Sequence, residues 1–377
     1  MSVTAARGFR AAGVCAGLKA SGKPDLALVV NDGPLDTAAG VFTTNRVVAA
    51  PVVWSRRLLT GQEGGRPGHA RAVVLNSGSA NACTGEHGLR DTEATAACAA
   101  GLLRTEPGQV LVCSTGVIGE RIDMPVLLEG IDVAALALAD TPRAGTDAAT
   151  AIMTTDTVSK EDVLTVGTGE KGWTIGGMIK GVGMLAPGLA TMLAVITTDA
   201  VLTPREAQDA LASVTARTVN RINSDGCMST NDTVLLLASG ASGVTPSRAE
   251  FDEALTDVMG RLGRRLVADA EGATHDIAIT VSGAVSEAAA ELRADAQSLE
   301  HGIDLGPSAV DDDGAHPDLV EEEDVLGEGT FELVVHHGVA AVLDDHGGAL
   351  VGAQPWHGLQ QDGGLDLRVE RCPVHVV

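Results

Sequence analysis

Short apolar runs separated by glycine and asparagine dominate residues 1 to 90. The runs LALVV at 26–30 and AVVLN at 72–76 are bounded by such breaks. Runs of this length, punctuated in this way, are typical of β-strands joined by tight turns. The alanine-rich stretch that follows, from Asp91 to Arg104, predicts a helix.

Two later segments carry helix start signals. Thr203, Pro204 and Glu206 follow the order of an N-cap, a first-turn proline and a capping-box acid, and Ser247 with Glu250 repeats the box. Apolar residues three or four apart then give the second helix one apolar face: Phe251, Leu255, Val258, Met259, Leu262 and Leu266. Strand-like runs flank it at 234–239 and 277–283. This mixture predicts an α+β protein with helices layered on sheets.

The pattern changes after residue 284. The stretch EAAAELRADAQ is compatible with a helix, and an acidic run, DDDGAHPDLVEEED, follows at 311–324. A charge run of this kind usually forms a solvated loop.

Composition narrows the class of protein. A chain of 377 residues suggests two or three folding units, and no apolar run approaches the roughly 18 residues that cross a bilayer. The first residues lack the features of a secretory signal, so we expect a cytoplasmic protein that does not enter the membrane. A net charge of −24 makes nucleic acid an improbable partner. The six cysteines form no CxxC pair, which indicates reduced thiols and no metal site.

Three kinds of apparent ligand motif are not supported as binding sites by the surrounding sequence. GLKASGKP at 17–24 resembles a phosphate-binding loop, but Pro24 stands where a hydroxyl should reach magnesium. GTGEKG at 167–172 lies between two strand-like runs, where a dinucleotide site needs a helix, so we expect a hairpin turn. The pairs His336/His337 and Asp345/His346 are read as surface residues, because spacing alone is weak support for a metal.

The segment 180–200, unlike these motifs, combines a flexible stretch with a candidate nucleophile. A stretch of small residues runs directly into Thr191 and then into the strand-like MLAVITTD. This junction puts a hydroxyl at the start of a strand, beside the little-hindered carbonyl of Ala190. Most threonines in this position only begin a strand, since threonine favours strands.

The same junction has the groups that self-cleavage needs. Attack of the Thr191 hydroxyl on the Ala190 carbonyl gives an ester, and water then releases a new N-terminal threonine. The freed α-amine has an ordinary pKa of about 7.7 to 8.0, so it can serve as the general base for its own hydroxyl.

Several further blocks follow one another along the chain: GFRAAGVCAGLKASGKPDLALVV, VFTTNR at 41–46, LNSGSANACTG at 75–85, STGVIG at 114–119, AIMTTDT at 151–157, KGVGMLAPGLATML at 180–193 and STNDTVLLLASG at 229–240. In this order they resemble the ornithine acetyltransferases. The resemblance implies a layered helix-sheet-sheet-helix sandwich of the ornithine acetyltransferase and aminopeptidase type, with an additional smaller α/β domain.

The resemblance also implies roles for seven residues. Thr191 would be the nucleophile, and cleavage after Ala190 would give an α chain of 1–190 and a β chain of 191–377. Thr115 and Gly116 match the oxyanion hole. The family positions that bind substrate fall on Thr154, Lys180, Thr191 and Glu271, with Lys180 facing a carboxylate and Glu271 an amino group.

The implied reaction is a ping-pong acetyl transfer. N-acetylornithine would acetylate Thr191, ornithine would leave, and glutamate would take up the acetyl group to give N-acetylglutamate, a step of arginine biosynthesis. No metal or cofactor is required, although some members also accept acetyl-CoA as donor. Mature members are commonly α2β2 assemblies.

The resemblance covers roughly residues 8 to 283, and 284–377 is atypical. Family members next carry an Asn-Leu segment, an Asp-Pro-Asn-Trp-Gly-Arg stretch and a substrate-binding asparagine, whereas the last asparagine here is Asn231. A shifted reading frame or a divergent end would produce this. Two alternatives therefore stay open: an amide hydrolase or aminopeptidase on the same scaffold, and an inactive product with a defective C-terminal region.

Overall fold

The computed structural model describes residues 2–62, 65–183, 192–223, 228–270, 273–282, 330–338 and 366–372. For Asn223 and the last three ranges it describes the backbone alone. Ala190, Thr191 and Glu271 lie outside the described residues, as do the stretch EAAAELRADAQ, the acidic run and the Asp345/His346 pair. None of the helices in these ranges combines the length and hydropathy needed to cross a membrane.

The first sheet has four strands in the order β1-β2-β4-β5. They are β1 (Phe9–Val14), β2 (Leu26–Asn31), β4 (Ala72–Ser79) and β5 (Val110–Val117). The β1–β2 and β2–β4 pairs are antiparallel, and β4 and β5 run parallel, as expected for a pair joined through a helix. The runs LALVV and AVVLN are thus strands, as the sequence predicts.

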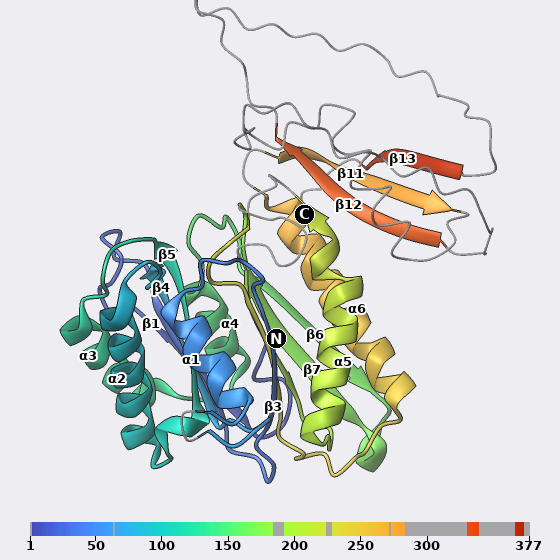
Figure 1. The fold of residues 1–377 in the computed structure, drawn as a ribbon. Coiled ribbons are helices and arrows are strands. Elements are labelled where there is room, and N and C mark those ends of the chain that lie inside the picture. The colour runs from blue at the N-terminus through green and yellow to red at the C-terminus, as the bar shows by residue number, and fades with distance from the viewer. Residues whose placement is uncertain are drawn as a thin grey trace, which may run out of the picture.

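Helices α2 (Gly85–Leu103) and α3 (Met124–Ala137) pack on the outer face of this sheet (Figure 1). Helix α1 (Ala50–Leu59) lies along its free edge, where Trp54 and Ser55 hydrogen-bond to the backbone of β5. The prediction of a helix from Asp91 is right in type but wrong at its start, because α2 begins six residues earlier, after Thr84. Its alanines allow close packing, and Arg104 ends the helix in a left-handed conformation with φ of 55°.

The second sheet has five strands in the order β3-β10-β8-β7-β6. They are β3 (Thr37–Phe42), β6 (Lys160–Val166), β7 (Trp173–Lys180), β8 (Leu193–Thr198) and β10 (Thr233–Ala238). The β8–β10 pair is parallel and the other pairs are antiparallel. The GTGEKG segment forms the turn between β6 and β7, with a short 3-10 helix at Gly169–Lys171, so the hairpin prediction is confirmed.

Helices α5 (Pro204–Arg217) and α6 (Arg248–Ala268) pack on the second sheet. Thr203 and Glu206 form the predicted capping box at α5. At α6 the Ser247 side chain accepts from the Glu250 amide, which is the first half of the predicted box. A 3-10 helix at Val219–Arg221 follows α5, and another at Pro107–Gln109 precedes β5.

Alternation along β8 and β10 shows that the second sheet is buried on both faces. Leu193, Val195, Leu235 and Leu237 join the core shared with the first sheet, whereas their neighbours join the core under α5 and α6. Successive strand residues point to opposite faces, so one face meets the first sheet and the other meets helices. The order is therefore helix, sheet, sheet, helix, which confirms the predicted α+β sandwich (Figure 1).

Helix α4 (Pro142–Ala151) contacts β1 and β2 of the first sheet and β6 and β7 of the second. A third sheet, with strand order β13-β11-β12-β9, contacts the C-terminal part of α6 (Figure 1). Its strands are β9 (Ile222–Asn223), β11 (Ala273–Ser282), β12 (Thr330–Gly338) and β13 (Asp366–Cys372), and His336 and His337 lie on β12.

Candidate active site

Thr115 and Gly116 lie at the end of β5, where its register against β4 shifts at Gly78 and Ser79. Thr115 is buried, and Gly116 adopts a φ of 131°, a conformation that favours glycine. A Cβ atom on Gly116 would lie 2.4 Å from the carbonyl carbon of Gly78. The local backbone therefore requires glycine at position 116.

Lys180, at the end of β7, brings the predicted site residues together. Its ammonium donates to the Thr154 hydroxyl at 2.8 Å and to the Thr115 hydroxyl at 3.3 Å. Thr154 lies in the loop between α4 and β6, and Thr115 belongs to the other sheet. Thr115 and Thr154, which are distant in sequence, thus meet at the buried ammonium of Lys180, between the two sheets.

Lys180 is a lysine with an almost fully buried side chain. Its side chain is 2% exposed, and lysine is almost never buried unless it is paired. Burial lowers the pKa of its ammonium to about 8, although the nearby Asp156 carboxylate raises it. Lys180 is therefore mostly cationic at neutral pH but loses its proton in the mildly alkaline range.

Asn231 ties this region to the start of β10. Its amide nitrogen donates to the carbonyl oxygens of Ser114, at 2.8 Å, and of Ala80, at 2.6 Å. Ser114 precedes Thr115 in the chain, so Asn231 fixes the backbone that presents Thr115. Both acceptors are buried, and leaving either without a donor would cost about 1–3 kcal/mol.

Asp232 reaches the residue before β8. Its Oδ1 accepts from the Met192 backbone amide at 2.9 Å, while its Oδ2 is buried and has no hydrogen-bond partner among the described residues. Burial raises the pKa of Asp232 well above its usual range, against the opposing effects of the Met192 amide, the Ser229 side chain and the Lys180 charge. Neighbouring residues 231 and 232 therefore hold both the backbone before Thr115 and the backbone at Met192.

Comparison with known proteins decides the family. The sequence profile of the ArgJ family matches residues 10–298. The chain belongs to the ArgJ family.

Curated relatives agree with this assignment. The arginine biosynthesis bifunctional protein ArgJ of Bifidobacterium longum is 58% identical over 291 residues, which are 77% of this chain and 72% of that protein. The protein of the same name from Streptomyces coelicolor is 57% identical over 287 residues, 76% of this chain and 72% of its own length.

Solved structures of the family are also similar. Ornithine acetyltransferase of Mycobacterium tuberculosis, in complex with ornithine, is 52% identical and aligns with 50% of this chain and 96% of that chain, at a TM-score of 0.47. An ArgJ protein from Bacillus halodurans is 36% identical, aligns with 51% of this chain and 95% of that chain, and has a TM-score of 0.45.

Four of the seven predicted site residues lie in the described part of the chain. Thr115, Thr154 and Lys180 come together, with Gly116 beside them, whereas Ala190, Thr191 and Glu271 lie outside the described residues.

Sequence reasoning missed five polar residues around these groups: Asp156, Lys160, Asn231, Asp232 and Asp269. Two signals pointed to some of them. Asp156, Asn231 and Asp232 lie inside the blocks AIMTTDT and STNDTVLLLASG, and Lys160 is one of only five lysines.

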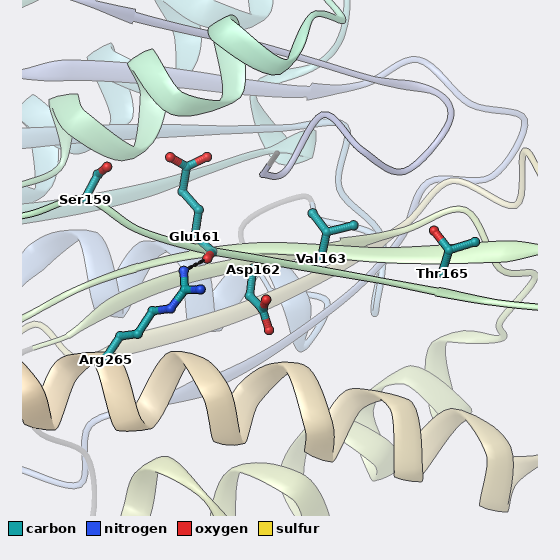
Figure 2. Close-up of a pocket in the computed structure, with 6 residues that line it drawn as sticks. All are labelled: Ser159, Glu161, Asp162, Val163, Thr165 and Arg265. Atoms are coloured by element: carbon teal, nitrogen blue, oxygen red, sulfur yellow. Dashed lines mark hydrogen bonds between the residues drawn. The ribbon is translucent and has the colours of Figure 1, made fainter. Parts of the chain in front are cut away.

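A shallow depression of about 700 Å³ lies between β6 and α6 (Figure 2). It is lined by Ser159, Glu161, Asp162, Val163, Thr165 and Arg265, and Arg265 donates to the carbonyl oxygen of Glu161. None of the residues that converge on Lys180 lines it. The depression follows the edge strand of the second sheet and is not the site described above.

The loop that resembles a phosphate-binding motif, at 17–24, surrounds the side-chain carboxylate of Asp25, the next residue in the chain. The backbone amides of Ala16, Gly17 and Lys19 donate to Asp25 at 2.6–3.1 Å, so they are not turned toward a phosphate. The described residues also contain no group of three or more side chains suited to hold a metal ion.

Proposed function

We propose that this chain cleaves itself between Ala190 and Thr191 and transfers an acetyl group from N-acetylornithine to glutamate. The main support is the meeting of Lys180, Thr115 and Thr154 at one buried point, in a chain of the ArgJ family. The cation suits the carboxylate that both amino-acid substrates carry.

In the first half-reaction, the Thr191 Oγ would attack the acetyl carbonyl of N-acetylornithine while the α-amine of Thr191 takes its proton. Thr115 and the Gly116 backbone would stabilise the oxyanion, and ornithine would leave with that proton as the C–N bond breaks. In the second, the amine of glutamate would attack the acetyl ester, and the Thr191 oxygen would regain a proton as N-acetylglutamate leaves.

This reaction requires no metal or cofactor, and acetyl-CoA remains a second candidate donor. We further propose that the protein acts in the cytoplasm, since the named relatives are bacterial biosynthetic proteins. The resemblance to ornithine acetyltransferases supports assembly of the two chains as α2β2.

Intact-protein mass spectrometry and product analysis test the proposal together. The mass should show two chains separated after Ala190, and N-acetylornithine with glutamate should give N-acetylglutamate. Thr191→Ala should abolish both cleavage and transfer. Thr168→Ala, which changes an exposed threonine in the β6–β7 turn, should leave both intact.

Two other outcomes separate the alternatives. Free acetate in place of N-acetylglutamate would identify an amide hydrolase. A protein that melts cooperatively but stays uncut and inactive would identify the inactive product, and residual transfer by Thr191→Ala would place the nucleophile elsewhere.

A further inference from the structure

A buried chain of four charges runs away from the candidate site. Lys180 lies 3.9 Å from the Asp156 carboxylate, which lies 2.7 Å from the Lys160 ammonium, and Lys160 in turn pairs with Asp269 at 2.5 Å. The side chains of Asp156 and Lys160 are fully buried, and that of Asp269 is 6% exposed. Burial of so many charges is costly unless each is paired, so their arrangement needs an explanation.

Asp156 is the centre of this chain. Its Oδ2 accepts from the Thr154 backbone amide at 3.0 Å, and its Oδ1 accepts from the Gly181 amide at 2.8 Å. One carboxylate therefore fixes the backbone beside both Thr154 and Lys180, in addition to facing the Lys180 ammonium. Burial alone would raise the pKa of Asp156, but the charges of Lys180 and Lys160 outweigh it and lower that pKa.

Lys160 and Asp269 connect this centre to helix α6. Asp269 follows the last residue of α6, and its carboxylate also accepts from the Thr157 amide at 3.1 Å and from the Thr157 hydroxyl. The loop that carries Thr154 and Asp156 is thus held at Thr157 as well. Asp269 stands two residues before Glu271 in the sequence.

The electrostatic consequence concerns Lys180. Asp156 faces two lysines, so its negative charge is balanced by Lys160 as well as by Lys180. Lys160, which also pairs with Asp269, offsets part of the Asp156 charge, so a carboxylate that approaches Lys180 meets less repulsion from Asp156. Without Lys160, the anions Asp156 and Asp269 would both lack that cation, and they would repel a third carboxylate.

We propose that Asp156 and Lys160 are positioning residues of the acetyl-transfer site, which hold Lys180 and Thr154 in place and set the affinity for the substrate carboxylate. This inference rests on the proposed function. It assigns these residues no contact with the reacting atoms, because they act through Lys180 and Thr154.

Paired substrates test the proposal. N-acetylornithine and its α-carboxamide differ in one charge, so the ratio of their kcat/KM values measures how strongly the site recognises the carboxylate. In Lys160→Met this ratio should fall roughly tenfold or more, chiefly through KM for the acid. In Asp156→Asn it should fall as well, because the single amide oxygen of asparagine cannot accept from both the Thr154 and Gly181 amides that hold the backbone beside Thr154 and Lys180. Lys160→Arg should restore most of the ratio, since it keeps the cation.

Asp252→Asn is the matched control. Asp252 pairs with Arg248 at 2.6 Å on the partly exposed side of α6, and its loss should leave the ratio unchanged. Melting temperature and the extent of self-cleavage are measured for every variant.

The outcomes are distinct. A fall in kcat/KM that is equal for the acid and the amide would overturn the proposal, because a purely structural role lowers both together. If Asp156→Asn does not fold, the substrate ratio of Lys160→Met alone tests the proposal. If Lys160→Arg also fails to fold, the pair has a structural role and the proposal is wrong. Absence of acetyl transfer by the unchanged protein would refute the proposed function itself, before any variant is compared.

Discussion

The ammonium of Lys180 donates a hydrogen bond to the hydroxyl oxygen of Thr115 at 3.3 Å. Because Thr115 accepts this bond, its own proton remains available for another oxygen. No described residue accepts that proton. The cation also polarises the hydroxyl, which makes Thr115 a better donor to a developing negative charge.

Thr115→Val removes this donor while it keeps the shape of the side chain. We expect kcat for acetyl transfer to fall by about 10²–10³, the usual loss of one oxyanion-hole donor. Self-cleavage should slow as well, since it passes through a tetrahedral oxyanion at Ala190. Rates of product formation and the time course of cleavage by mass spectrometry measure both effects.

Thr115→Ser is the control, because it keeps the hydroxyl and removes one methyl group. It should retain most of the activity. Equal activity in Thr115→Val and the unchanged protein would show that another group stabilises the oxyanion.

Much of the layered fold is readable from the sequence because local signals agree with the tertiary structure. The strands LALVV and VLLLA are apolar on both faces, as burial between two layers requires, and the N-cap at Thr203 starts α5 where the sequence places it. The start of α2 was misplaced because residues 85–90 are mostly polar or glycine, with weak helical preference.

The site is readable only in part, for a different reason. Thr115, Thr154 and Lys180 belong to separate elements, and no spacing in the chain records that β5 and β7 meet there. The ion pair of Lys160 with Asp269 joins residues 109 positions apart. Such contacts arise from packing of the two sheets and α6, so periodicity cannot reveal them.

The pKa of Lys180 gives a pH-dependent contribution to stability. Folding lowers this pKa from 10.5 to about 8 through burial. Between these values the unfolded chain binds more protons than the folded one, so the contribution of Lys180 to the free energy of unfolding rises with pH. The full effect approaches about 3 kcal/mol, at 1.36 kcal/mol per pKa unit.

Lys180→Met removes the titration. The difference in free energy of unfolding, unchanged protein minus variant, should increase by about 1–2 kcal/mol between pH 8 and pH 9.5, as measured by urea denaturation. Lys171→Met changes an exposed lysine in the β6–β7 turn and should give a difference that does not vary in this range. A flat difference for Lys180→Met would mean that Lys180 is not buried as a cation.

Loss of the Lys180 proton should weaken substrate binding, although it increases the contribution of Lys180 to stability. As the pH rises through about 8, Lys180 loses the charge that we propose to face the substrate carboxylate, so KM for N-acetylornithine should increase. Its α-carboxamide carries no such charge, and its KM should change less. Parallel pH profiles for the two substrates would contradict this role.

Gly116 and Gly119, at and just after the end of β5, separate two costs of replacing a glycine in this segment. Both have positive φ, 131° and 89°, but a Cβ on Gly116 would meet the Gly78 backbone at 2.4 Å, whereas a Cβ on Gly119 meets nothing within 4 Å. Gly119→Ala should therefore cost only the conformational strain, about 1–2 kcal/mol. Gly116→Ala adds a clash with backbone that no side-chain rotation can relieve.

The clash on Gly116 falls on the two adjacent strands that present Thr115. Either β5 moves away from β4 or the loop changes conformation, and each displaces the Thr115 hydroxyl from Lys180. Because oxyanion stabilisation depends on donor distance, we expect Gly116→Ala to lose acetyl transfer and self-cleavage by at least about 10², and Gly119→Ala to lose little. Melting temperatures and cleavage rates measured side by side distinguish these effects. Equal behaviour of the two variants would show that the loop tolerates a side chain at 116, which the close approach of Gly78 argues against.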